Sequence, residues 1–217
     1  ESFTDARYDV SIIMMRRSIL RSLNRLGINQ IDLIFFQDPE AIPEDSFSEV
    51  LDALQQFQYE GLIKEIGLAG ELSEPWQSEL ANDTFSAFMG ARKLNACNLS
   101  ALQKDIPHTK QLGIPYYAAS PLYQGLLGKQ FEAYRSKRPF WMSKEDVLRA
   151  HRLHLLSNRL NKEMSYLALR FAFSLACIDY WVIGPENQAE WEQTIQAWED
   201  GPLDEETFTL ICDKIYL

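Results

Sequence analysis

Residues 11–39 have the sequence SIIMMRRSILRSLNRLGINQIDLIFFQDP, and this stretch decides the fold. After Ser11 the apolar residues recur every three or four positions until Gly27, which is the spacing of an amphipathic helix with a glycine stop. Residues 31–36 then form a short apolar run, and Pro39 prevents its continuation as a central strand. A helix followed at once by a buried strand predicts an α/β protein with a parallel sheet.

The same alternation continues along the chain. Helices are expected over residues 50–57, 106–112, 143–159, 165–175, 188–198 and from 204 onward, and further strands over residues 62–68, 85–89, 114–119 and 178–183. Such alternation implies right-handed crossovers and helices that cover the sheet. Five strands are expected, whereas a (β/α)₈ barrel has eight strands in about 250 residues. A doubly wound sheet is the alternative, although the glycine fingerprint of a dinucleotide-binding βαβ unit is missing.

Composition and charge narrow the possible partners. The 217 residues are 46% hydrophobic and 24% charged, as in an ordinary soluble globular protein. With 21 Lys and Arg against 31 Asp and Glu, the net charge is -10, which argues against a nucleic-acid partner. No apolar run approaches the roughly 18 residues of a membrane span, and the start of the chain lacks the features of a signal peptide. The sequence therefore predicts a cytoplasmic protein without a membrane partner.

The cysteines and histidines give no pattern typical of a metal site. Cys97, Cys177 and Cys212 are odd in number and far apart, which indicates free thiols. His151 and His154 fall on one face of an expected helix but lack a matching array of acids or cysteines. No metal is expected.

Several blocks of sequence, taken in order, resemble the aldo-keto reductases. They are RSILRSLNRLG at 17–27 with IDL at 31–33, GLIKEIG at 61–67, GIPYYAASPL at 113–122 with GLLGK at 125–129, and ALRF at 168–171 with VIG at 182–184. The family pattern has SL-x-RLG and IDL, then GKIRAIG, then GIPV-x-AYSPL with GLLTGK. The family consists of TIM-type (β/α)₈ barrels that reduce carbonyls with a nicotinamide cofactor. The resemblance implies one partial barrel domain over residues 1–217, holding the fourth to eighth units and lacking the first three.

The resemblance also implies a catalytic position. Family enzymes use Asp, Tyr, Lys and His, and the first three lie before the block where this chain begins. Gln37 stands in the position of the His, within the motif that the family writes as HDP. Gln can donate or accept a hydrogen bond but cannot take up a proton, so Gln37 is expected to orient a carbonyl without acid–base chemistry. The alternative is that Gln37 only begins a polar turn.

Nine cofactor-binding positions follow from the same resemblance. Ala69 and Gly70 match the Ser-Asn pair that holds the nicotinamide carboxamide, and Ala119 matches the aromatic residue that stacks on the nicotinamide. The pyrophosphate loop corresponds to Ser120, Leu122 and Gln124, and the segment after the last strand to Gly184, Glu186 and Glu190.

The two acids bear on the choice of cofactor. Family members that use NADPH place basic or hydroxyl residues where this chain has Glu186 and Glu190. A carboxylate ~5 Å from a 2′-phosphate costs on the order of 1 to 3 kcal/mol per charge, so NADH is favoured over NADPH. The alternative is that both acids complement the positive end of the helix beginning near Gln188, and the two explanations are compatible.

The favoured hypothesis is an oxidoreductase that transfers hydride between a nicotinamide cofactor and a small carbonyl or alcohol substrate. Gln37, Ala69, Gly70, Ala119 and Glu186 motivate the alternative, a non-catalytic barrel relative that binds or acts as a scaffold. A third hypothesis is that a five-unit fragment covers its open sheet edges by oligomerising. The sequence identifies neither the substrate nor the oligomeric state.

Overall fold

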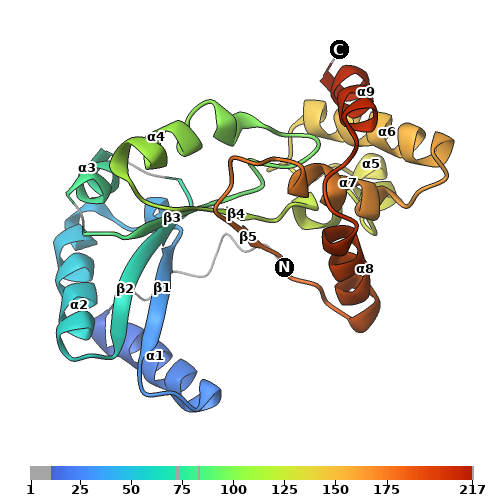
Figure 1. Cartoon of the computed structure of the whole chain (residues 1–217). Coiled ribbons are helices and arrows are strands. Elements are labelled where there is room, and N and C mark those ends of the chain that lie inside the picture. Colours follow the sequence, from blue (N-terminus) through green and yellow to red (C-terminus); the bar gives the residue numbers. More distant parts are fainter. Residues whose placement is uncertain (1–10, 72–73, 83, 217) are drawn as a thin grey trace. The chain divides into compact units, whose positions relative to one another are not determined.

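The computed structural model describes residues 11–71, 74–82 and 84–216. These residues fall into two compact units, one ending at Met89 and the other beginning at Gly90 (Figure 1). Each unit contains parallel strands separated by helices, so the predicted parallel α/β class is confirmed. The assignment of residues 1–217 to one partial barrel domain stays a prediction.

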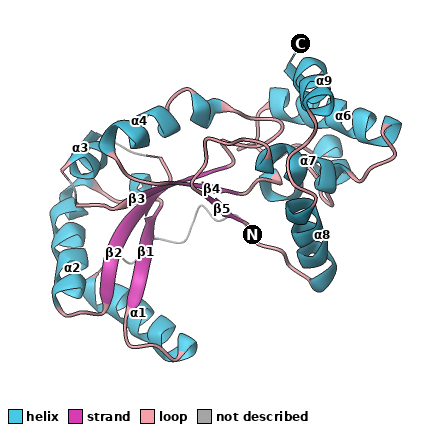
Figure 2. Cartoon of the chain, in the orientation of Figure 1, coloured by secondary structure: helices cyan, strands magenta, loops and turns pink. Residues whose placement is uncertain are grey.

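The first unit contains three parallel strands. In chain order its elements are α1 (Ile12–Leu26), β1 (Ile31–Gln37), 3-10 turns at Pro39–Ala41 and Glu44–Ser46, α2 (Phe47–Tyr59), β2 (Ile63–Ala69), α3 (Glu74–Ala81) and β3 (Ala87–Ala91), which crosses the boundary. Strand β1 pairs with β2 from Ile31↔Ile63 to Gln37↔Ala69. Strand β2 pairs with β3 from Gly67↔Ala87 to Ala69↔Met89. Helix α2 packs on β2, and α1 packs on α2 (Figure 2).

Aromatic packing around Trp76 forms the core of this unit. The Trp76 side chain is only 2% exposed, and its ring lies 5.3 Å from that of Phe36, 4.8 Å from Phe47 and 6.1 Å from Phe85. Trp76 belongs to α3, a helix that the sequence did not predict because it is short and buries only Trp76 and Leu80. Two apolar residues in eight give no clear helical periodicity.

The second unit joins two parallel strands to a cluster of helices. Its elements are α4 (Asp105–Leu112), β4 (Tyr116–Ala119), α5 (Phe131–Ser136), α6 (Lys144–Arg159), α7 (Met164–Phe173), β5 (Tyr180–Val182), α8 (Gln188–Glu199) and α9 (Glu205–Tyr216), with 3-10 turns at Ser100–Leu102 and Tyr123–Gly125. Strand β4 pairs with β5 from Tyr117↔Tyr180 to Ala119↔Val182. Helix α6 packs against α5, α7 and α9, and α7 packs against α8.

Several bounds differ from the sequence prediction. Strand β4 begins at Tyr116 rather than at residue 114, and β5 is limited to Tyr180–Val182 rather than 178–183. Pro115 has no N–H for a ladder, and the N–H of Tyr116 donates to Asp179 Oδ2 over 3.0 Å. A hydrogen bond to the Asp179 side chain therefore replaces the first backbone hydrogen bond of the strand ladder. Helix α5 also lies between residues 119 and 143, where the sequence predicted no helix.

Close packing of β1 on β2 gives the first testable prediction. A Cβ at Gly67 would lie 2.5 Å from Phe35 Cε1 and 3.2 Å from the carbonyl oxygen of Ala87, so Gly67→Ala forces the Phe35 ring to move. Overpacking of this kind costs about 1–3 kcal/mol, and urea denaturation should show that loss in the free energy of unfolding. Gly184→Ala is the control, because a Cβ there meets nothing within 4 Å. Equal stability of the two variants would contradict the packing argument.

Candidate functional site

In the first unit, two of the predicted site residues lie side by side at the carboxyl ends of strands. Gln37 is the last residue of β1 and pairs in register with Ala69, the last residue of β2. The Gln37 side chain is exposed, and its Nε2 lies 3.4 Å from Asp38 Oδ2. Asp38 takes a left-handed conformation with φ 54° and donates its N–H to the carbonyl oxygen of Ala69. The carbonyl of Ala69 is thus engaged by the turn after β1.

Gly70, the next predicted position, leaves room for a carboxylate. Its φ of 132° is accessible mainly to glycine, and a Cβ there would lie 2.9 Å from Glu40 Oε2. Glu40 Oε2 accepts a hydrogen bond of 3.1 Å from the N–H of Glu71. Burial, more than the neighbouring charges of Asp38 and Glu71, raises the pKa of Glu40. Sequence reasoning missed Glu40, since no local motif marks it.

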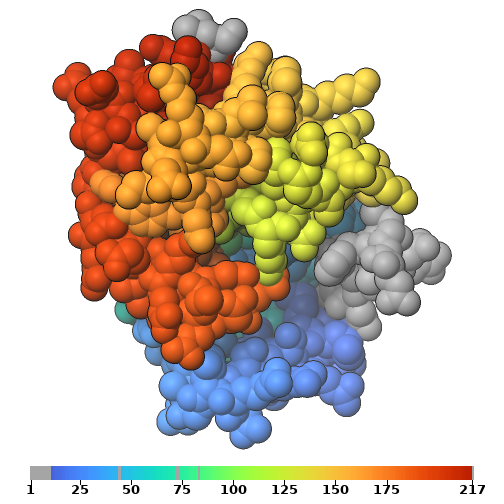
Figure 3. Space-filling view, turned by 90° about the vertical axis from the view of Figure 1, so that its right-hand side faces the viewer, coloured from blue at the N-terminus to red at the C-terminus, as the bar shows by residue number. Residues whose placement is uncertain are grey.

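In the second unit, the remaining predicted positions surround one cavity. Its volume is about 840 Å³, and its walls come from the loop after β4, the segment from β5 into α8, and the start of α7. It brings together Ala119, Ser120, Leu122, Gln124, Gly184, Glu186 and Glu190. In Figure 3 the yellow-green surface near α5 lies against the orange surface of the segment that leads into α8. This volume is within the usual range for small-molecule sites.

The loop after β4 has an unusual backbone. Ser120, Tyr123 and Gln124 have φ of 61°, 50° and 52°, and Gly125 has φ of 85°. A left-handed conformation costs a non-glycine residue roughly 1–2 kcal/mol, so this loop stores strain. Its first N–H, from Ser120, donates to Val182 O over 3.3 Å, which ties the loop to the end of β5.

Helix α8 begins at the cavity and is capped by its own side chains. Asn187 is the N-cap, and its Oδ1 accepts from the N–H of Glu190 over 3.0 Å. Glu190 Oε2 in turn accepts from the N–H of Glu186 over 2.8 Å. This exchange resembles a capping box, a pattern visible in the sequence as Asn-x-x-Glu. Glu190 therefore complements the helix end, as the second explanation predicts for both acids, whereas the carboxylate of Glu186 contacts Lys129.

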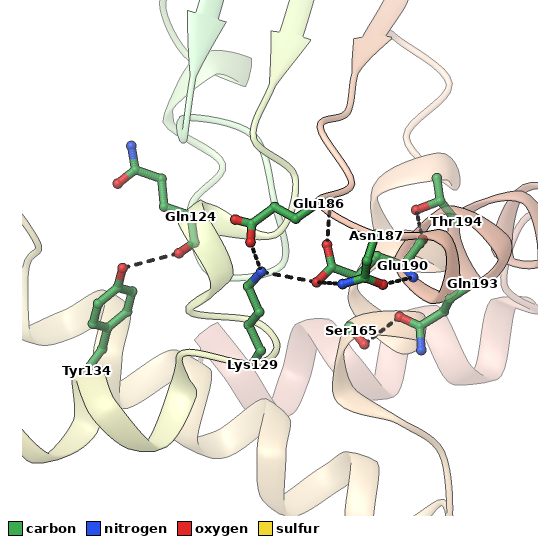
Figure 4. Close-up of polar contacts among 9 residues, drawn as sticks. All are labelled: Gln124, Lys129, Tyr134, Ser165, Glu186, Asn187, Glu190, Gln193 and Thr194. Carbon is green, nitrogen blue, oxygen red and sulfur yellow. Dashed lines mark hydrogen bonds and ion pairs between the residues drawn. The ribbon is translucent and has the colours of Figure 1, made fainter.

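Lys129 is a charged residue of the cavity that the sequence did not point to. Its Nζ contacts Glu186 Oε2 and lies 3.1 Å from Glu190 Oε1, and Figure 4 shows the ammonium between the two carboxylates. The two carboxylates raise the pKa of Lys129, and the N–H of Glu186 together with Lys129 lowers the pKa of Glu190. One positive and two negative charges leave the cluster with a formal charge of about -1.

Further polar contacts fix the walls of the cavity. Ser165 Oγ donates to Gln193 Oε1 over 2.6 Å, and Thr194 Oγ1 donates to the carbonyl oxygen of Glu190 over 2.8 Å. Across the cavity, Tyr134 Oη donates to the carbonyl oxygen of Gln124 over 3.3 Å (Figure 4). The arrangement offers hydroxyl, amide and carboxylate groups for recognition of a polar ligand.

Within the described residues, no three His, Cys, Asp or Glu side chains are grouped so that they could hold a metal ion. A search of the helices in that same part of the chain finds none with the length and apolarity required to cross a membrane.

Parallel strands with crossover helices define an α/β protein, and the cavity at the carboxyl ends of two strands lies where barrel enzymes place their active sites. The sequence matches the model of the Aldo/keto reductase family over residues 4–216. The chain belongs to this family.

Individual relatives are distant. The chain is 25% identical over 185 residues to D-threo-aldose 1-dehydrogenase of Pseudomonas sp. This alignment covers 84% of this chain and 56% of that protein. It is 26% identical over 219 residues to L-galactose dehydrogenase of Arabidopsis thaliana, with 93% of this chain and 64% of that protein covered. The chain thus spans less than two thirds of the length of these relatives.

A solved structure supports the fold. Aldo-keto reductase AKR11C1 from Bacillus halodurans, in its holo form, aligns with a TM-score of 0.67 and 18% identity over 96% of this chain and 69% of its own. The likeness establishes a shared fold over the aligned part.

The carboxylate beside Gly70 yields a prediction about pH. Because the pKa of Glu40 in the folded chain is above the ordinary value of 4.5, ionisation of Glu40 lowers the free energy of unfolding as the pH rises through that raised pKa. Glu40→Gln removes this loss but keeps an acceptor for the N–H of Glu71. Urea denaturation at about pH 4 and about pH 7 should show the variant gaining stability relative to the parent at the higher pH. A gain at the lower pH instead would contradict the assignment.

Proposed function

We propose that this chain is part of a nicotinamide-dependent oxidoreductase that acts on a small carbonyl or alcohol substrate. The observation that carries the proposal is the cavity of the second unit, where seven residues predicted to bind the cofactor line one space. Membership of the family and the names of the two dehydrogenase relatives support the same activity. When bound, the cofactor supplies the hydride for carbonyl reduction or accepts it from an alcohol.

The cavity suits the adenosine diphosphate end of a dinucleotide. The loop Ser120–Gly125 offers backbone and hydroxyl groups to a diphosphate, and Glu186 offers an exposed carboxylate that can accept hydrogen bonds from ribose hydroxyls. Carboxylates serve that role in other dinucleotide sites. The N–H groups of Glu186 and Glu190 already donate to protein side chains, so they are not available to a further phosphate.

These contacts favour NADH over NADPH. A 2′-phosphate at the start of α8 would meet a cluster of net charge about -1 and a helix end that Asn187 and Glu190 have capped. Lys129 reduces the repulsion that two isolated acids would produce, because it pairs with both. The preference for NADH therefore depends on the capping bonds as well as on charge.

The catalytic contribution of the first unit is orientation. Gln37 lies at the carboxyl end of β1 with an exposed amide that can hydrogen-bond to a substrate carbonyl. Ala69 and Gly70 offer no side-chain hydrogen bond to a carboxamide, so we assign any contact there to backbone atoms or to Glu40. We assign the five described strands to the fourth to eighth units of a (β/α)₈ barrel, and the proton-transfer residues Asp, Tyr and Lys to the earlier units. A cytoplasmic location stays a prediction.

The non-catalytic alternative predicts a different experimental result. Nothing in the comparisons with known proteins supports a binding or scaffold protein. Absence of NADH binding would favour that alternative, whereas turnover on simple aldehydes would exclude it.

The charge cluster gives a direct test of the cofactor preference. Titration of the 217-residue chain, followed by quenching of its tryptophan fluorescence, should give a Kd for NADPH about tenfold above that for NADH. Glu186→Gln brings the cluster to a net charge near zero, so the Kd for NADPH should fall several-fold. The Kd for NADH should rise, because the ribose hydroxyls lose their carboxylate acceptor.

Lys129→Gln is the matched variant that changes the charge of the cluster in the opposite direction. It leaves both carboxylates without their cation. Its Kd for NADPH should rise further. Equal affinities of the parent chain for the two cofactors, or identical responses of the two variants, would refute the preference for NADH.

A further inference from the structure

The loop Ser120–Gly125 faces the cavity with all of its residues except Tyr123. Ser120, Pro121, Leu122, Gln124 and Gly125 line the cavity. The Tyr123 side chain is instead 5% exposed and belongs to the hydrophobic cluster formed by α6, α7 and α9. One residue in the middle of the loop therefore connects the cavity wall to the helices behind it.

That connection is a buried hydrogen bond. Tyr123 Oη donates to Asp146 Oδ2 over 2.8 Å, and the Asp146 side chain is 6% exposed. Burial and the adjacent Asp146 carboxylate raise the pKa of Tyr123, so its hydroxyl keeps its proton and remains a donor at neutral pH. A bond from a hydroxyl to a buried carboxylate is stronger than one between neutral groups.

Asp146 is itself held in place. It lies in the first turn of α6, and its N–H donates to Oγ of Ser143, the N-cap of that helix, over 2.9 Å. Its position is set by a helix of sixteen residues rather than by the loop. The Tyr123–Asp146 bond thus attaches the strained loop to the regular helix α6.

Strain makes this attachment necessary. Tyr123 and Gln124 have successive left-handed conformations, which non-glycine residues keep only when the surrounding structure imposes them. On the cavity side, the half-buried Tyr134 contacts the carbonyl oxygen of Gln124 over a longer distance of 3.3 Å. The shorter and fully buried bond of Tyr123 is the firmer of the two restraints.

We propose that Tyr123 and Asp146 are positioning residues for ligand binding: their buried hydrogen bond holds the loop Ser120–Gly125 in the left-handed conformation that shapes the cavity wall. The inference rests on the proposed function, because the diphosphate of a dinucleotide is the ligand group that this loop would contact. Neither residue touches the ligand.

Hydrogen–deuterium exchange of the free protein tests the restraint without any ligand. Tyr123→Phe removes only the hydroxyl, and backbone amides of the loop should exchange about tenfold faster than in the parent chain. Tyr166→Phe is the matched control, because it removes a bond from Tyr166 to Asp200 between α7 and the end of α8. In that control the loop should exchange at the parent rate.

Conservative replacement of the acceptor distinguishes a specific restraint on the loop from a general loss of stability of the second unit. Asp146→Asn keeps an oxygen that can accept from Tyr123, so loop exchange should stay within about threefold of the parent, whereas Asp146→Ala should match Tyr123→Phe. Unchanged loop exchange in Tyr123→Phe, or an equal increase across all helices of the second unit, would overturn the proposal. So would an increase in Asp146→Asn as large as that in Asp146→Ala.

Binding of ADP-ribose, measured by calorimetry, completes the test. Its Kd should rise about five- to tenfold in Tyr123→Phe and change less than twofold in Tyr166→Phe. An unchanged Kd despite faster loop exchange would overturn the positioning role. Failure of the parent chain to bind ADP-ribose, combined with the expected exchange pattern, would instead refute the proposed function while upholding the restraint on the loop.

Discussion

Parallel pairing of the strands is the constraint on which the rest of the structure depends. Parallel strands cannot be joined by tight turns, so each connection carries a helix, and the carboxyl ends of neighbouring strands meet at one edge. In the first unit this brings Gln37 beside Ala69, and in the second it brings Ala119 beside Val182. The segments that leave these ends carry the polar groups, while strands β2, β3 and β4 contribute mostly buried residues.

The sequence was sufficient to predict the elements whose apolar residues recur with a regular period. Helix α1 follows its predicted span closely, because its apolar spacing and the left-handed Gly27 are local signals. The prediction failed for the elements whose existence or bounds depend on tertiary contacts. Helix α3 depends on Trp76 entering a cluster with Phe36, Phe47 and Phe85, and the start of β4 depends on Asp179, 63 residues away. No local pattern contains that information.

The predicted site was partly recoverable for a similar reason. Seven of the positions predicted to bind a cofactor line one cavity, because ordered sequence motifs indicate where each residue lies on the fold. Charge was harder to predict, since Lys129 is 57 residues from Glu186 in sequence yet contacts it in the structure. Two acids that suggest simple repulsion from the sequence thus form a capped and partly neutralised group. The capping bonds themselves were predictable from Asn187 and Glu190 alone.

The loop after β4 shows why a buried polar contact selects a conformation more than it stabilises a fold. A hydrogen bond to a charged group contributes about 1.5–3 kcal/mol net, whereas three left-handed non-glycine residues together cost roughly 3–6 kcal/mol. The Tyr123–Asp146 bond therefore offsets only part of the strain at Ser120, Tyr123 and Gln124. Loss of the bond leaves a buried carboxylate without its donor, so alternative loop conformations that keep Tyr123 buried are disfavoured. The net gain in stability is small, whereas the discrimination between conformations is large.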